Sequence, residues 1–337
     1  MKEAYLYKKL SQKRVQCYNC PHRCVLKPGQ RGICGVKENQ NGRLYSLVYG
    51  KAVVLNTDPI EKKPFFHFLP GTYSLSVATV GCQFRCANCQ NWQISQGPKI
   101  TGRIEGENVS PKQIVETAKS RKLPSISYTY TDPIVFSEYA LDTMKLAKKQ
   151  GIKNCWVTSG FFSKKLLERV SPYMDAANVD LKYFSDKDYI KYSGGRLQPV
   201  LDTLKGLKKK GIWVEVTTLV IPTINDSEKT LKAIAKFIKN ELGKETPWHV
   251  TQFCGAISWK FQDLPDTSVA TLAKVRKIGI KEGLEYVYVD NVPGVEGEST
   301  FCPKCGSKVI KRIGYSIKRY DKNGKCPKCN FKLHIIN

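Results

Sequence analysis

The stretch YSLSVATVGCQFRCANCQNW, residues 73–92, joins a predicted strand directly to a loop that carries three cysteines. Its first eight residues are rich in apolar and β-branched side chains, which favours a buried strand. Cys82, Cys86 and Cys89, the cysteine triplet, follow in the spacing C-x3-C-x2-C. Because functional loops of parallel α/β sheets follow the carboxyl ends of their strands, we expect the triplet to lie in a functional site.

The same strand pattern recurs five times between residues 125 and 253, with amphipathic helices between the strands. Ser110-Pro111, Ser163 and Ser227 mark predicted helix starts, because serine caps and a first-turn proline favour helix initiation. Alternating strands and helices imply an α/β fold with a parallel sheet. Six such units fit a partial (β/α)6, TIM-like barrel better than a complete eight-stranded one. The predicted strands are YSLSVATV, SISYTY, NCWVTS, ANVDL, IWVEVTTLV and WHVTQF.

Two cysteine-rich segments flank this pattern, so we expect three domains. Residues 1–70 are loop-rich and predict an N-terminal metal-binding module with a β-hairpin that turns at Asn41-Gly42. Residues 71–296 form the predicted barrel. Residues 297–337 carry two CPKC motifs across a short hairpin-like stretch and predict a zinc-ribbon-like module.

Composition and charge limit the class of protein. Apolar residues make up 41% of the 337 residues, which is typical of an ordinary globular protein and excludes a disordered one. No signal-like stretch or long apolar run is present, which predicts no membrane span and a cytoplasmic location. In that compartment, thirteen cysteines indicate metal ligation rather than disulfides. The formal net charge of +26 favours contact with polyanions or acidic proteins.

The cysteine triplet points to a catalytic iron–sulfur site. A cube normally takes four thiolates, whereas this loop offers three, so one iron is left without a protein ligand. An open coordination position is typical of catalytic metal sites. S-adenosylmethionine (SAM) can chelate that iron through its amino and carboxylate groups. An electron from a reduced [4Fe–4S] cluster then breaks the sulfonium C–S bond and yields a 5′-deoxyadenosyl radical. The alternative is a zinc knuckle that takes its fourth ligand from elsewhere.

Two further groups of four cysteines remain. The two C-terminal CPKC motifs predict a structural zinc site, with rubredoxin-like iron as the competitor. The N-terminal spacing fits either zinc or an auxiliary iron–sulfur cluster, with His22 as a candidate substitute ligand. The C-terminal group is Cys302, Cys305, Cys326 and Cys329, and the N-terminal group is Cys17, Cys20, Cys24 and Cys34.

The whole chain resembles the radical S-adenosylmethionine superfamily, and within it the radical enzymes of the AmmeMemoRadiSam system, which are related to pyruvate formate-lyase activating enzyme. The resemblance implies a partial (β/α)6 barrel, a bound [4Fe–4S] cluster, SAM, and a reduced ferredoxin- or flavodoxin-like electron donor. It leaves open whether the substrate is a small molecule, a lipid, a nucleic acid or a protein. The matching stretches are CYNCPHRCVLKPGQRGICGVKEN, DPIEKKPFFHFLPG, GCQFRCANCQNWQIS, ANVDLKYFSD, WVEVTTLVIP, PWHVTQF and the final CPKCG.

The resemblance also assigns cofactor-binding residues. The segment TYTDP after the second strand would receive the methionine amino group, through Thr131 and Asp132. VTSG after the third strand would approach the ribose through Ser159, and VDLK after the fourth would place Asp180 and Lys182 near the methionyl carboxylate or a bound cation. Charged strand ends suit a zwitterionic cofactor. The alternative is that these are ordinary polar strand termini.

Four positions depart from the family pattern. Asp132 stands where a longer glutamate is usual, Ser159 where asparagine is usual, and Asn88 where an aromatic residue commonly precedes the third cysteine. Cys254, at the end of the sixth strand, stands where relatives tend to have histidine. A catalytic thiol at Cys254 would donate a hydrogen atom to a substrate radical or ligate a metal; the alternative is a neutral replacement.

Three functions follow from these observations. The first is an enzyme that generates a deoxyadenosyl radical and abstracts hydrogen from an unidentified substrate. The second is an activase that installs a glycyl radical on a partner enzyme, against which the two extra cysteine modules argue. The third is a basic, metal-stapled nucleic-acid-binding module, against which the intact triplet argues. Cleavage of SAM separates the first two from the third, which predicts strongly salt-dependent RNA binding.

Overall fold

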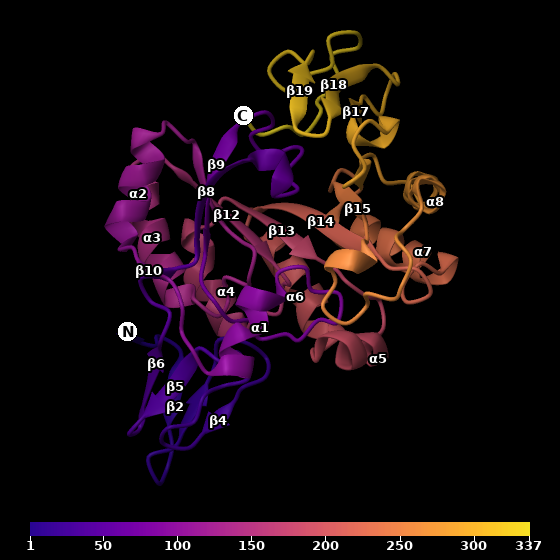
Figure 1. The fold of residues 1–337 in the computed structure, drawn as a ribbon. Helices are drawn as coiled ribbons and strands as arrows, with labels where there is room; N and C mark the ends of the chain where they lie inside the picture. The colour runs from indigo at the N-terminus through magenta and orange to yellow at the C-terminus, as the bar shows by residue number, and fades with distance from the viewer.

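The computed structural model describes residues 1–337, and an eight-stranded sheet lies at its centre (Figure 1). Seven strands, β9 and β11 to β16, run parallel to their neighbours, and β8 pairs antiparallel with β9 at one edge. The sheet is open, since β8 and β16 are its two edges. The strands, in spatial order, are β16 (Val287–Asp290), β15 (Trp248–Gln252), β14 (Trp213–Val220), β13 (Ala176–Asp180), β12 (Lys153–Thr158), β11 (Ser125–Tyr128), β9 (Tyr73–Ala78) and β8 (Val54–Pro59).

Helices connect the successive parallel strands and pack on the sheet around a core of 54 buried residues. The predicted helix starts are confirmed, because Ser110, Ser163 and Ser227 each accept a hydrogen bond from a first-turn backbone N–H. No helix is both long and apolar enough to cross a membrane. The helices are α1 (Trp92–Thr101), α2 (Pro111–Ser120), α3 (Ser137–Lys149), α4 (Lys164–Val170), α5 (Asp186–Asp188), α6 (Leu197–Lys209), α7 (Glu228–Phe237) and α8 (Val269–Lys281).

All six predicted strands are present in the parallel sheet, which confirms the α/β class. Two more strands extend it. The run YVYVD supplies β16, the seventh parallel strand, and β8 pairs with β9 along its whole length. Residues 54–59 therefore belong to the central sheet, although they lie within the predicted N-terminal module of residues 1–70. Local pattern did not predict this because the partner of a strand is chosen by long-range packing.

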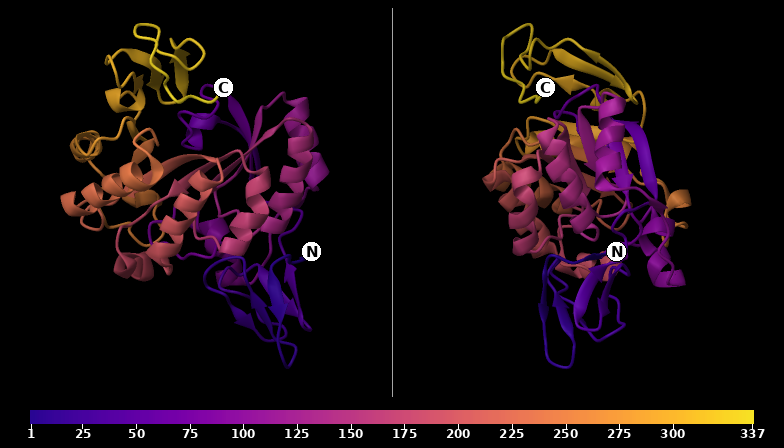
Figure 2. Two further views of the ribbon diagram at one scale, coloured as in Figure 1. Left: turned by 180° about the vertical axis from the view of Figure 1, so that it is seen from behind. Right: turned by 90° about the vertical axis from the view of Figure 1, so that its left-hand side faces the viewer.

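Small sheets form the two ends of the molecule, and both views of Figure 2 place them at opposite ends of the central sheet. The predicted hairpin turn is confirmed: Asn41 and Gly42, between β5 and β6, both have the positive φ angles of a tight hairpin turn. The N-terminal strands are β1 (Lys2–Glu3), β2 (Tyr7–Lys9), β3 (Val15–Cys17), β4 (Val25–Leu26), β5 (Lys37–Gln40), β6 (Arg43–Ser46) and β7 (Lys51–Ala52), of which β7 pairs with β10 (Glu107–Asn108); the C-terminal strands are β17 (Thr300–Phe301), β18 (Lys308–Ile313) and β19 (Ser316–Arg319).

A buried polar network holds residues 66–68, in the segment after β8, against β14. The Glu215 carboxylate, on β14, accepts hydrogen bonds from the backbone N–H groups of residues 66–68 at 3.0–3.2 Å. It also pairs with His249 Nε2 at 2.8 Å, while His249 Nδ1 lies 3.1 Å from an Asp290 oxygen. The buried Arg312 of the C-terminal module donates to the Phe66 carbonyl at 2.8 Å. The network therefore joins the sheet, this segment and the C-terminal module.

This network predicts a pH dependence of stability. Burial lowers the pKa of His249, but Asp290 and Glu215 outweigh it and leave the pKa above the ordinary 6.5. Burial raises the pKa of Glu215, yet His249 leaves it below the ordinary 4.5. Because the pKa of His249 is raised, its contribution to stability is fully present below pH 6.5. Because the pKa of Glu215 is lowered, its contribution is fully present above pH 4.5. The contribution of the pair is therefore greatest between these values and declines as the pH rises through the raised pKa of His249.

We expect this alkaline decline to be absent from His249→Gln, so the difference in unfolding midpoint between wild type and this variant should shrink as the pH rises through the raised pKa of His249. Thermal unfolding followed by circular dichroism between pH 5 and pH 9 measures it. The half-exposed His334, replaced by glutamine, is the matched control and should follow wild type at every pH. Parallel wild-type and His249→Gln curves across that range would contradict the prediction.

Candidate functional site

A cavity of about 400 Å3 opens at the carboxyl ends of the parallel strands. The loop after β9 brings the cysteine triplet into its wall, as predicted from the strand–loop junction. The ends of β11, β12 and β13 contribute the five residues predicted to bind the cofactor, Thr131, Asp132, Ser159, Asp180 and Lys182. The triplet therefore shares one wall with residues as far along the chain as Lys182, which lies 100 positions after Cys82. A cavity of this size suits a small-molecule cofactor.

Hydrogen bonds hold the triplet loop in place. The backbone N–H of Phe84 donates to Cys82 Sγ at 3.4 Å, and the sulfurs of Cys86 and Cys89 lie 3.2 and 3.3 Å from serine hydroxyls. The Ala87 carbonyl accepts from Ser258 Oγ at 3.1 Å, so the β15–α8 loop packs against the triplet loop. These contacts fix the positions of the three sulfurs, whose thiolate form is the one that binds metals.

The triplet thiols are poorly suited to remain ionised by themselves. Burial raises the pKa of Cys82 well above its ordinary value, and the nearby Asp132 carboxylate raises it further. Burial also raises the pKa of Cys86, which the Lys182 ammonium partly offsets. A bound cation is therefore needed to hold these sulfurs as thiolates.

Asp132 is the centre of the hydrogen-bond network behind the triplet. Its Oδ2 atom accepts from Gln83 Nε2 at 2.8 Å and from the Ser159 hydroxyl and backbone N–H at 2.6 and 2.9 Å. Its Oδ1 atom accepts from Thr158 Oγ1 at 2.8 Å and from a backbone N–H two residues on. These five donors occupy the lone pairs of the carboxylate, so Asp132 ties three loops together. Sequence reasoning missed Gln83, which lies inside the triplet motif and carries no spacing signal of its own.

A strained residue precedes Asp132. Tyr130 has a φ of +65°, which a bulky residue rarely adopts, and the Thr131 N–H donates to the Thr129 carbonyl at 2.8 Å across it. The Tyr130 hydroxyl donates to Asp58 Oδ2 at 2.7 Å and holds this turn against β8. Such strain is tolerated where the surroundings over-determine the backbone, commonly at functional sites.

Asp180 and Lys182 form an ion pair at the end of β13, with Lys182 Nζ 2.7 Å from Asp180 Oδ2. Burial lowers the pKa of Lys182, but the Asp180 carboxylate, helped by the neighbouring Cys86, outweighs it and raises the pKa well above normal. The ammonium is therefore charged and lies close to the triplet. The end of β13 thus presents one cation and one carboxylate to the cavity.

The end modules also contribute to the cavity, which the sequence did not predict. Lys62 and Lys63, from the segment after β8, and Tyr315, between β18 and β19, line it together with Tyr130. Lys63 Nζ lies 2.8 Å from Asp58 Oδ2, and burial lowers its pKa to about 8. The pair Lys62-Lys63 could not be recognised as part of the cavity from the sequence. Its orientation depends on the way β14 holds residues 66–68.

Cys254 lies outside this wall. It precedes a short 3-10 turn after β15 and is half-buried, and it is not among the residues that line the cavity. Its predicted catalytic role stays a prediction. Asn88, by contrast, does line the cavity and accepts a hydrogen bond from the Tyr183 hydroxyl at 3.3 Å.

The C-terminal group of four cysteines can hold a metal ion. All four sulfurs lie within 4.8 Å of one another, with Cys302 and Cys329 at 3.5 Å and Cys305 and Cys326 at 3.6 Å. The module around them buries a cluster of only four residues. So small a core cannot hold a fold by itself, whereas a four-thiolate site can.

Cys326→Ser should therefore release this metal and unfold the C-terminal module. A structural four-thiolate site contributes about 10 kcal/mol or more, which four buried residues cannot replace. Metal analysis should show one ion fewer per chain, and limited proteolysis should cut within residues 297–337. The exposed Lys328, replaced by alanine in the same loop, is the control and should keep both the metal and the protease resistance. Retention of the metal by Cys326→Ser would contradict the assignment.

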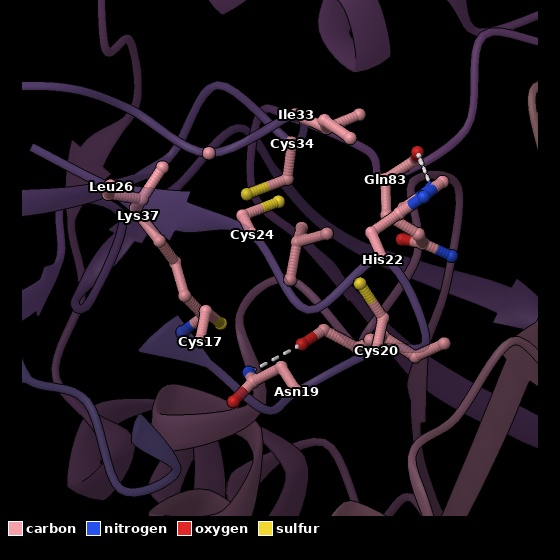
Figure 3. Close-up of a pocket in the computed structure, with 13 residues that line it drawn as sticks. Cys17, Asn19, Cys20, His22, Cys24, Leu26, Ile33, Cys34, Lys37 and Gln83 are labelled. Atoms are coloured by element: carbon pink, nitrogen blue, oxygen red, sulfur yellow. Dashed lines mark hydrogen bonds between the residues drawn. The ribbon is translucent and has the colours of Figure 1, made fainter. Parts of the chain in front are cut away.

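The N-terminal group of four cysteines surrounds a separate pocket (Figure 3). Cys17, Cys20, Cys24 and Cys34 all line it, so β3 and the loops around β4 bring together residues up to 17 positions apart. His22 also lines the pocket, but its Nε2 atom lies 3.1 Å from the Gln83 carbonyl. This contact gives the His22 ring a backbone partner, and its role as a ligand stays a prediction.

Comparison with known proteins gives consistent results. The model of a family described as the radical SAM superfamily matches residues 76–237. An uncharacterized protein of Methanocaldococcus jannaschii is 44% identical over 339 residues, covering all of both chains. The pyruvate formate-lyase-activating enzyme of Clostridium pasteurianum is 26% identical over 164 residues, 48% of this chain and 67% of that enzyme. A radical SAM methyltransferase from Sphaerobacter thermophilus superposes with a TM-score of 0.52 at 14% identity, covering 68% of this chain and 71% of that one, a likeness of fold alone.

Proposed function

Because the chain belongs to the radical SAM superfamily and is an enzyme, we propose that it binds a [4Fe–4S] cluster through Cys82, Cys86 and Cys89 and cleaves SAM reductively. One observation carries the proposal: the triplet and five polar strand-end residues line a single cavity of about 400 Å3. Three thiols suit a cube with one iron left for a substrate-like ligand. When bound, the cluster supplies the electron that splits SAM into methionine and a 5′-deoxyadenosyl radical, which abstracts hydrogen from the substrate.

The residues of the wall support SAM binding by their charges. The carboxylate and ammonium of SAM need partners of opposite sign, and Asp180 and Lys182 offer one of each beside Cys86. We assign Thr131 and Ser159 to the remaining polar groups of the cofactor. Asp132 acts through the loops that it ties, since its oxygens are already occupied. It is therefore a positioning residue.

The substrate contacts Lys62, Lys63 and Tyr315 in this proposal. These three residues line the cavity and come from outside the parallel strands. The modules of residues 1–70, apart from strand β8, and of residues 297–337 thus act as separate domains beside the barrel of residues 71–296, whose sheet β8 joins. The C-terminal module uses zinc in this proposal, because all four sulfurs lie within 4.8 Å of one another and two pairs lie 3.5 and 3.6 Å apart, which suits a tetrahedral ion. A reduced ferredoxin or flavodoxin supplies the electron, and the net charge of +26 favours such acidic donors.

Anaerobic reconstitution with iron and sulfide, followed by reduction, tests this function. We expect wild-type protein to convert SAM into 5′-deoxyadenosine and methionine in equal amounts, measured by liquid chromatography and mass spectrometry. Heat-denatured protein carrying the same iron serves as the control. A protein that holds the full cube and leaves SAM intact would overturn the proposal.

A second candidate is a glycyl-radical activase, which the likeness to a pyruvate formate-lyase-activating enzyme favours. Such an enzyme must admit a protein loop into the cavity. The assay is electron paramagnetic resonance of a glycyl-radical enzyme incubated with this chain, SAM and reductant. A glycyl-radical doublet would select the activase. Cleavage of SAM without a glycyl-radical doublet would favour an enzyme that acts on another substrate.

A further inference from the structure

The N-terminal group of four cysteines is a ligand set that the proposed SAM chemistry does not use. Its four thiols face one pocket, as Figure 3 shows, and three of the four are only half-buried. Four cysteines around a common space are sufficient ligands for either a zinc ion or an iron–sulfur cube. The spacing of the sulfurs separates these two possibilities.

A tetrahedral zinc ion draws its thiolates together. With Zn–S bonds of about 2.3 Å, the sulfurs of a four-thiolate site lie about 3.8 Å apart. The C-terminal group meets this condition, with all four sulfurs within 4.8 Å of one another. No three sulfurs of the N-terminal group do, and neither does the cysteine triplet. The N-terminal group therefore resembles the triplet in spacing and differs from the zinc-like group.

A cube needs that wider spacing, because each thiolate binds a different iron at a separate corner. Gly32 keeps the surroundings of these sulfurs open: a side-chain carbon there would lie 3.8 Å from both Cys24 Sγ and Cys34 Sγ. Leu26, Ile134 and Val135 complete an apolar wall, as expected around a cluster shielded from water.

We propose that Cys17, Cys20, Cys24 and Cys34 hold a second [4Fe–4S] cluster. All four irons have a protein thiolate, so this cluster has no open position for SAM. The assignment goes beyond the proposed function, and it stands whether or not the triplet cleaves SAM.

The second cluster lies against the triplet loop. Gly81 and Gln83, the residues on either side of Cys82, both contact the N-terminal module. A side chain on Gly81 would lie 3.0 Å from the Cys34 carbonyl, and the Gln83 carbonyl is 3.1 Å from His22 Nε2. Clusters held by these two touching loops would be neighbours, and a single electron lost by one would be gained by the other.

Metal and sulfide analysis of anaerobically reconstituted protein tests the assignment. Wild type should hold about eight irons, about eight sulfides and one zinc per chain, as two cubes and one zinc site require. The double variant Cys17→Ala/Cys20→Ala should lose about half of the iron and keep the zinc. Cys326→Ser should lose the zinc and keep all of the iron. About four irons and two zincs in wild type would overturn the assignment, and this count needs no variant to fold.

The triple variant Cys82→Ala/Cys86→Ala/Cys89→Ala separates this proposal from the first. After reduction it should show a [4Fe–4S]+ resonance that SAM does not shift, because the N-terminal cluster has no open iron. A triple variant without iron would contradict the second cluster and would leave the proposed cleavage of SAM untouched. In fully reduced wild type, the two resonances should broaden each other, and the broadening should vanish in both cluster variants. Unbroadened spectra from protein with eight irons would contradict the contact between the two clusters.

Discussion

Replacing Cys86 by alanine should reduce the formation of 5′-deoxyadenosine to background while the fold is kept. Cys86 is buried in the cavity wall, next to the charged Lys182, and it is one of only three thiols that this loop offers. With two thiolates left, the loop cannot hold a cube with a defined open iron. The deoxyadenosine yield of reconstituted, reduced protein and its iron content measure the effect.

Cys155→Ala is the matched control for this experiment. Cys155 is equally buried, but it packs with Ile60, Phe65 and Phe68 beneath the sheet. Its loss should cost about 1 kcal/mol of stability and leave cluster and activity unchanged. Wild-type deoxyadenosine yield from Cys86→Ala would show that the triplet is not the cluster site.

Replacing Asp132 by alanine should produce the largest loss of stability among the cavity residues. The carboxylate accepts five hydrogen bonds, and its removal leaves the buried Gln83, Thr158 and Ser159 without their partner. Unsatisfied buried donors cost about 1–3 kcal/mol each, so we expect the free energy of unfolding to fall by about 3 kcal/mol or more. Denaturant unfolding followed by circular dichroism measures the loss.

The same variant should also bind SAM at least about tenfold more weakly, which corresponds to about 1.4 kcal/mol. The reason is positional, because three loops of the cavity wall meet at this carboxylate. The exposed Asp263, replaced by alanine, is the control and should stay within about 0.5 kcal/mol of wild type. Asp132→Asn keeps the shape of the side chain, so it should fall between wild type and alanine. Equal stability of Asp132→Ala and wild type would show that the network does not hold the loops.

The sequence predicted the central architecture well, because the signals involved are local. A strand that ends at Ala78, shortly before Cys82, and helices that are capped by Ser110 and Ser163 need no knowledge of distant residues. Strands β8 and β16 were missed for the opposite reason. Their flanking sequence does not say that β8 joins β9 or that β16 extends the sheet beyond β15.

The candidate site divides in the same way. Spacing identified the triplet, and the resemblance to a known family pointed to Asp180 and Lys182, all of which line one cavity. Neither source pointed to Gln83, Lys63 or Tyr315. Their place depends on contacts across the chain, such as the one between Arg312 and the Phe66 carbonyl, 246 residues apart.

The sequence by itself determined which residues can ligate metals and that the triplet follows a parallel strand. Cysteine spacing and strand periodicity depend only on residues that are close together in the chain. It left the metal of the N-terminal group open between zinc and iron–sulfur. Only the tertiary structure could separate those, since the distance between sulfurs depends on how β3, β4 and their loops fold around Gly32. It also decided that the two cysteine loops touch on both sides of Cys82, which no spacing along the chain encodes.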